Sequence, residues 1–172
     1  MIRGTLVSGL LLLTPTAAQA DCVAACMRDA PLASQDHFVR ADAVRRCRDG
    51  CEREMRGKIA SSGLDERLRS CERRDLTLPE FRQLRGANPS WQQQFNIFTW
   101  QVTNRFEDLV LTGLEVTTQD LNLSTVTLSA AALIPPGETG TFVIPDFFDG
   151  YPAVRYATKV ERVTACALPP AP

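Results

Sequence analysis

The chain has 172 residues, of which 19 are basic, 20 are acidic and six are cysteine. A formal net charge of −1 argues against a protein that binds nucleic acid through its phosphates. The length permits one ordinary domain or two small ones.

The first twenty residues have the pattern of a secretory signal peptide. Arg3 precedes an apolar run, and small residues precede the expected cleavage position after Ala20. The run is too short to span a bilayer, which disfavours a retained anchor. A lipid anchor on Cys22 is disfavoured because Asp21, rather than a small residue, precedes that cysteine. We therefore expect a periplasmic or secreted protein with no transmembrane segment in the mature chain.

Composition changes sharply near residue 86. Residues 21–85 carry 14 basic and 12 acidic side chains, and 13 of the basic ones are arginine. Later residues carry only 4 basic and 8 acidic side chains and are rich in Thr, Val and Leu. We predict an α+β protein in four parts. These are a signal peptide at 1–20, a disulfide-stapled helical region at 21–86, an antiparallel β-sandwich at 87–166 and a Pro-rich tail at 167–172.

Four cysteines form two Cys-x-x-x-Cys pairs, and residues four apart share one face of a helix. The sequence predicts one helix from residue 22 to about 30, and a second from about 34–36 to 60. Set antiparallel, these helices bring the sulfurs together as two rungs, Cys22–Cys51 and Cys26–Cys47. Cys71 is then left to pair with Cys166. Six cysteines allow 15 pairings, and we favour this one because helical geometry restricts four of the six cysteines.

Two further helices are expected before the composition changes. The third has an apolar stripe of Leu64, Leu68 and Cys71, extending toward residue 76. The fourth follows a capping box between Thr77 and Glu80, and a glycine at residue 86 is expected to end it.

The twin Cys-x3-Cys pattern of residues 22–51 resembles the twin-CX3C proteins of the mitochondrial intermembrane space and the hairpin peptides of plants. The resemblance implies the same two-rung helical hairpin and nothing about function. Such a hairpin buries little apolar surface, so a disulfide would contribute on the order of 3 kcal/mol to a fold that is marginal without it.

After residue 95 the spacing between apolar residues changes from three or four, which is typical of a helix, to two, which is typical of a strand. Strands are expected at residues 96–102, 109–118, 121–129, 140–144 and 153–164, separated by turn residues. The Val-Thr-Asn strand end and the Ile-Pro-Pro-Gly-Glu-Thr-Gly-Thr-Phe run resemble small bacterial extracytoplasmic immunoglobulin-like modules. That resemblance covers residues 91–166, lacks the cysteine and tryptophan spacing of antibody domains, and implies binding or scaffolding.

The sequence offers little catalytic chemistry. His37 is the one histidine, and there is no Gly-x-Ser-x-Gly nucleophile elbow. The cysteine pairs have three intervening residues, whereas thioredoxin-like redox sites have two. We therefore expect structural disulfides, no catalytic residue, no cofactor, no metal and no enzymatic activity. A thiol-redox factor, or a hydrolase using His37, is the less favoured alternative.

The most distinctive loop contains Phe147 and Phe148 between two acids, which is typical of a partner-binding lip or a core plug. Several arginines on the second helix could also contact a protein, although interleaved acids favour a solvated, paired face. We therefore expect an accessory or assembly factor that binds a protein partner in the cell envelope, including as a peripheral component of a membrane complex. A ligand-binding or inhibitory module is the alternative. The candidate arginines are Arg45, Arg48, Arg53 and Arg56.

Overall fold

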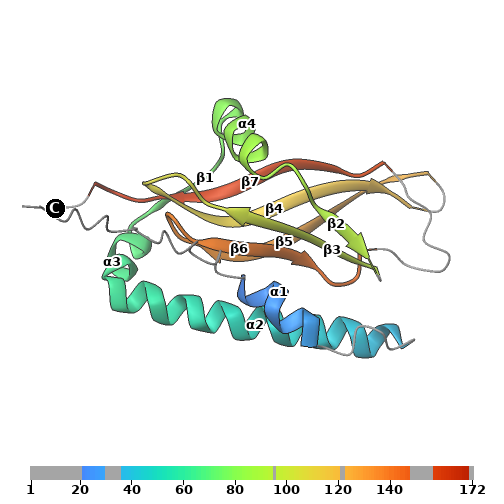
Figure 1. Cartoon of the computed structure of the whole chain (residues 1–172). Helices are drawn as coiled ribbons and strands as arrows, with labels where there is room; N and C mark the ends of the chain where they lie inside the picture. Colours follow the sequence, from blue (N-terminus) through green and yellow to red (C-terminus); the bar gives the residue numbers. More distant parts are fainter. Residues whose placement is uncertain (1–20, 30–35, 95, 121–122, 148–156, 171–172) are drawn as a thin grey trace, which may run out of the picture.

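A computed structural model of the chain describes residues 21–29, 36–94, 96–120, 123–147 and 157–170. Two antiparallel sheets form its centre (Figure 1). Helices α1 (Cys22–Asp29) and α2 (His37–Ser62) lie along the side where strands β5 (Thr125–Ile134) and β6 (Thr139–Ile144) run (Figure 1). Helix α4 (Leu78–Ala87) lies on the opposite side, beside β1 (Glu72–Asp75) and β7 (Lys159–Ala167).

Helices α1 (Cys22–Asp29) and α2 (His37–Ser62) form the predicted disulfide-linked pair. Cys22 is bonded to Cys51 and Cys26 to Cys47, with Cα–Cα distances of 5.7 and 5.6 Å. The Asp21 carboxylate accepts a hydrogen bond from the Ala24 N–H at 3.3 Å, which caps α1. The two predicted rungs are therefore confirmed.

Both ends of α2 have recognisable caps. The Asp36 carboxylate accepts hydrogen bonds from the Phe38 and Val39 N–H groups at 2.8 and 3.3 Å. At the other end Gly63 adopts φ 75°, and its N–H points back to the carbonyls of the last turn. A left-handed conformation is readily adopted by glycine, so α2 ends where the sequence changes from Ser62 to Gly63.

The third helix is shorter than predicted. Helix α3 (Leu64–Arg69) ends before Cys71, and the chain continues as strand β1 (Glu72–Asp75), which pairs antiparallel with β7. Arg73 lies opposite Cys166 in that register, and Cys71 is bonded to Cys166 as predicted. The helix prediction was wrong beyond residue 69 because pairing with β7 overrides the helical preference of this charged segment.

Helix α4 (Leu78–Ala87) begins at the predicted capping box, in which Thr77 and Glu80 satisfy one another's backbone groups. It continues one residue past the predicted end and is capped by Asn88. The Asn88 amide donates to Leu84 O at 2.9 Å and accepts from the Thr103 N–H at 2.9 Å. The end of α4 is thereby fixed to strand β3.

The strands form two separate sheets. One has the order β1-β7-β4-β5 and the other β2-β3-β6, with every pairing antiparallel. Five strands correspond to the predicted ones, with β5 and β7 displaced toward the C-terminus, whereas β1 and β2 were not predicted. In chain order, the strands after α4 are β2 (Gln92–Gln94), β3 (Ile97–Thr103), β4 (Leu109–Gln119), β5 (Thr125–Ile134), β6 (Thr139–Ile144) and β7 (Lys159–Ala167).

The main core contains side chains of both sheets and of α4. Phe98, Trp100 and Val102 of β3 point into it, as their alternation predicted, and each is fully buried. Side chains of both sheets belong to this one cluster, so the two sheets share a hydrophobic core. Burying apolar surface in this way stabilises a fold by about 25 cal/mol per Å².

A second, smaller core attaches the helical pair to the β2-β3-β6 sheet. Val23 of α1 and Val44 of α2 pack against Ile97 of β3 and Val143 of β6. Ile97 and Val143 are 3% and 1% exposed, so both strands are buried on their outward side at these positions. The helical region is thus docked on the sheet.

A third cluster occupies the end of the sheets near the Cys71–Cys166 bond, where leucines of α3 pack against Val110 and Leu168. The Leu168 N–H donates to Asp108 O at 2.7 Å, and the Arg67 guanidinium donates to Pro169 O at 2.7 and 2.9 Å. Residues 167–169, predicted as the start of a tail, are therefore packed. Among the described residues, no helix is both long and apolar enough to cross a membrane.

Candidate functional site

The candidate site lies beside the turn that connects β5 to β6. The Asn104 amide nitrogen donates to Leu109 O at 2.7 Å and to Ile134 O at 2.9 Å, and its backbone N–H donates to Glu138 O. The Gly137 N–H, in a turn where φ is 76°, donates to Asn104 O. These bonds hold the turn against the end of β3, so β5 and β6 enter different sheets.

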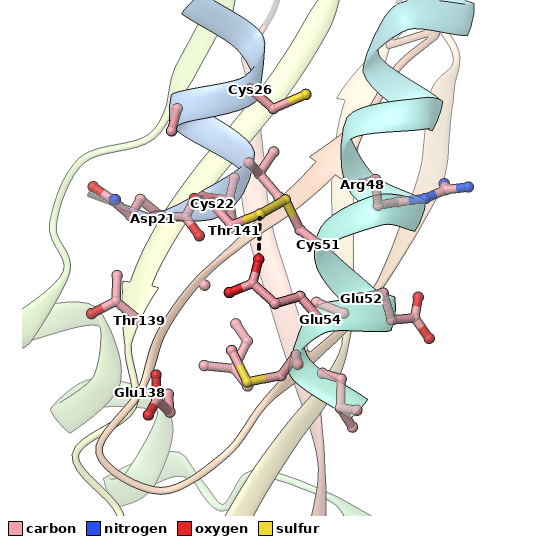
Figure 2. Close-up of a pocket in the computed structure, with 18 of the residues that line it drawn as sticks. Asp21, Cys22, Cys26, Arg48, Cys51, Glu52, Glu54, Glu138, Thr139 and Thr141 are labelled. Atoms are coloured by element: carbon pink, nitrogen blue, oxygen red, sulfur yellow. Dashed lines mark hydrogen bonds between the residues drawn. A yellow bond between two sulfur atoms is a disulfide. The ribbon is translucent and has the colours of Figure 1, made fainter. Parts of the chain in front are cut away.

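A groove of about 830 Å³ lies where those two strands diverge, and the disulfide-linked helices form its other wall (Figure 2). It is at the upper end of the size range typical of ligand pockets, about 300–1,000 Å³. Its strand side includes residues 131–134 of β5 and residues 139–141 of β6. Its helix side includes the Cys22–Cys51 bond, Glu54, Met55 and Lys58.

The disulfide and a buried hydrogen bond fix the helical wall. Figure 2 shows the Cys22–Cys51 bond bridging α1 and α2 above Glu54. The contact between Glu54 Oε2 and Cys22 Sγ is 3.6 Å long and is dashed in the figure. A half-cystine carries no proton to donate, so we interpret this as a close contact only. The Thr141 hydroxyl donates to the Asp21 carboxylate, which is 5% exposed, and so joins β6 to the start of α1.

The groove is more acidic than basic. Five carboxylates line it, against the two bases Arg48 and Lys58. Arg48 points away from the disulfide, whereas Glu54 points toward it (Figure 2). Among the described residues, neither Asp29 nor Glu138 takes part in an ion pair. The groove thus presents negative charge that its own bases only partly compensate. The carboxylates are those of Asp21, Asp29, Glu52, Glu54 and Glu138.

Strand β5 contributes a free edge to the groove. Within the described part of the chain, β5 pairs only with β4, and β6 pairs only with β3. The six residues of β6 are buried or half-buried, whereas alternate residues of β5 from Thr125 to Ala131 are exposed. A free strand edge presents unpaired N–H and C=O groups to whatever lies beside it.

A second cavity, of about 670 Å³, lies on the other side of α1. Gln101 and Thr141 line both cavities, so α1 lies between them. Trp91 lines the second cavity, and the Arg85 guanidinium lies 4.2 Å from the centre of its ring. Burial lowers the pKa of Arg85, and the aromatic ring partly compensates the desolvated charge.

Of the two phenylalanines predicted to form an interaction surface, the structure describes Phe147. Phe147 is 3% exposed and its ring stacks on Phe98, with centroids 5.2 Å apart. It therefore belongs to the core, which corrects its assignment to an interaction surface, and the core-plug alternative holds for this ring. Phe148 and the side chain of His37 lie outside the described residues.

The four candidate arginines all lie on α2. Arg45 pairs with Asp146 in the segment after β6, which adds an ionic contact between α2 and the sheets. Arg48 pairs with Asp49 at 2.9 Å, Arg56 pairs with Glu52 at 2.6 Å, and Arg53 is exposed. Pairs of this kind on an exposed surface contribute at most about 1 kcal/mol each. A contact between these arginines and a partner stays a prediction.

Within the described part of the chain, no three His, Cys, Asp or Glu side chains gather closely enough to hold a metal ion. No protein-family model, no curated protein and no solved structure matches the chain.

Sequence reasoning missed the groove, although part of the signal was present. The run Phe142-Val143-Ile144 has no polar alternation, which is typical of a strand that is buried on both faces. That run could have shown that something covers the outer side of β6. Nothing in the sequence placed Glu54 and Ala131 on the same groove, because they meet only when the helices dock.

Proposed function

We propose that this is an exported, non-enzymatic protein that acts through protein contacts, as an accessory or assembly factor of a cell-envelope complex. The observation that carries the proposal is the groove between the disulfide-linked helices and the diverging strands β5 and β6. A fixed cleft with both charged and apolar lining, beside a free strand edge, suits recognition of another polypeptide.

The proposal includes a finer interpretation of the fold. The helical pair is of the twin-CX3C type, and the two sheets are an immunoglobulin-like sandwich whose open side the helices cover. Two antiparallel sheets with a shared core support this interpretation. Three disulfides support an oxidising compartment, in agreement with a signal peptide at residues 1–20.

The test is to recover the natively expressed protein from envelope fractions under mild detergent, with and without chemical crosslinking. We expect one reproducible protein partner, present in both preparations and absent when the chain is expressed without residues 1–20. Recovery as a free monomer with no reproducible partner would contradict the proposal.

A ligand-binding or inhibitory module is the second candidate, because two cavities of about 830 and 670 Å³ flank α1. Native mass spectrometry of the protein purified from its own cells distinguishes the two. A small-molecule adduct of constant mass favours the second candidate, and a protein complex favours the first. Trapping of free thiols in the native protein would instead favour the redox alternative, since all six described cysteines are in disulfides.

A further inference from the structure

Strand β5 lacks two of the features with which edge strands usually avoid pairing with other chains. Its ten residues include no charged side chain and no proline. Such residues are a common protection of an edge, as are bulges and a covering helix or loop. The pairing of β5 with β4 has a register shift between Ala131 and Ile134, and α2 packs beside the strand. Alternate side chains from Thr125 to Ala131 are exposed, and the strand pairs only with β4 in the described part of the chain. Neither a charge nor a proline therefore opposes strand addition along the regular part of β5, residues 125–131.

We propose that an extended, lysine- or arginine-bearing segment of a partner protein adds as a strand to the free edge of β5 and lies in the groove between β5 and α2. This inference rests on the proposed function and names the chemistry of the partner segment. Main-chain hydrogen bonds to β5 on the Thr125 side of Ile134, whose carbonyl already accepts from Asn104, would supply affinity. Alternate side chains of the segment would supply specificity.

Charge complementarity selects a basic segment. Glu54 points into the groove beneath the disulfide, and Glu138 lies at the turn that opens it (Figure 2). Glu54 has Lys58 as an ion-pair partner at 3.4 Å, whereas Glu138 has no ion-pair partner among the described residues. Opposite charges across an interface steer association and suppress acidic competitors.

A second copy of this chain fits the groove less well. Helix α2 packs beside β5 and forms the opposite wall of the groove. A copy that offered its own β5 would bring its own α2 to the same place, so the two helices would compete for one space. An isolated extended segment has no such obstacle.

The first experiment uses a blocked ten-residue peptide of alternating lysine and valine as the probe, with fluorescence anisotropy as the readout. We expect binding that weakens at least tenfold when glutamate replaces lysine, and at least tenfold when every backbone nitrogen is methylated. Absence of binding up to about 1 mM would overturn the proposal. Equal binding of the methylated peptide would overturn it as well, because that peptide cannot donate main-chain hydrogen bonds.

Amide hydrogen exchange locates the added strand. With the lysine–valine peptide bound, we expect exchange in residues 129–134 to slow at least threefold. We expect no change in β2, the edge strand of the other sheet that does not line the groove. Protection confined to β2 or to the helices would overturn the proposal.

Two variants test the groove itself. Ala131→Arg places bulk and positive charge at the exposed edge, and we expect at least a tenfold loss of peptide affinity. Gln83→Arg, on α4 at the opposite side of the sheets, is the matched control and should bind within twofold of the wild type. Glu138→Lys should weaken binding at least threefold, whereas Glu107→Lys, at an exposed position between β3 and β4, should not. Circular dichroism confirms that each variant is folded.

The same variants separate this inference from the proposed function. If the wild type recovers an envelope partner and Ala131→Arg recovers it equally well, the groove inference fails while the proposed function stands. If the wild type recovers none, the proposed function fails. If sedimentation shows a dimer that Ala131→Arg dissociates, a second copy occupies the edge and the inference fails.

Discussion

Asn104 is fully buried, and its side chain satisfies three backbone groups in different parts of the chain. It donates to Leu109 O and Ile134 O, and it accepts from the Phe106 N–H at 3.1 Å. Asn104→Ala removes these three hydrogen bonds, two of which are buried, so we expect a loss of about 2–4 kcal/mol of unfolding free energy by urea titration. Arg105→Ala, at the exposed neighbouring position, should change it by less than about 0.5 kcal/mol. Equal losses would contradict this role for Asn104.

Glu80 combines a helix cap with an ion pair. Hydrogen bonds from Arg74, at 2.7 and 2.8 Å, are the main cause that lowers the pKa of Glu80 from 4.5 to about 2, with a further contribution from Thr77. Because the folded-state pKa is the lower one, unfolding takes up protons. The stabilisation is therefore complete above about pH 4.5 and is lost as pH falls toward 2.

Glu80→Gln keeps a capping side chain and removes the charge. We expect it to lose about 1–2 kcal/mol of unfolding free energy at pH 7, a figure reduced for solvent screening because the two side chains are 32% and 23% exposed. Urea titrations at pH 7, 4 and 2 should show the deficit shrinking with pH. A deficit of constant size would show that the charge is not its cause.

At the scale of elements, two glycines near the end of α2 should respond oppositely to the same substitution. Gly57 is exposed, and an added Cβ would meet nothing within 4 Å, so Gly57→Ala should stabilise the protein by about 0.5–1 kcal/mol. Gly63 has equal space but a φ of 75°, so Gly63→Ala should cost about 1 kcal/mol. Thermal unfolding followed by circular dichroism measures both. Destabilisation by Gly57→Ala would contradict an unstrained helical conformation there.

The sequence predicted best those elements whose pattern is local. The stripe Val44, Cys47, Cys51 lies on one face of α2 because helical period alone places it there, and the disulfide rungs followed from it. The alternation of β3 likewise predicted its buried face. Capping residues predicted the start of α4 for the same reason, since a cap acts within one turn.

Elements that depend on distant partners were missed or misplaced. Glu72-Arg73-Arg74-Asp75 has no β pattern and becomes a strand only because β7 offers an edge and Cys71 is bonded to Cys166. Phe147 was assigned to a surface because its neighbours are acidic, yet its ring stacks on Phe98 in the core. The groove could not be predicted for the same reason, since its walls come from α1, α2, β5 and β6 and meet only after the helices dock.

For the whole molecule, the three disulfides should differ in what they stabilise. Cys71–Cys166 spans 95 residues and joins the residue before β1 to β7, whereas Cys26–Cys47 spans 21 and lies inside the span of Cys22–Cys51. In the chain-entropy model the long loop contributes about 4–5 kcal/mol and the short one about 3 kcal/mol, less where a neighbouring bond already restricts it. The double variant Cys71→Ser with Cys166→Ser should therefore lose at least about 1 kcal/mol more of unfolding free energy in urea than Cys26→Ser with Cys47→Ser. It should also speed amide exchange in β1, while the second variant speeds it in α1. The reverse order of stabilities would mean that the helical pair, rather than the β1–β7 pairing, depends most on its covalent bond.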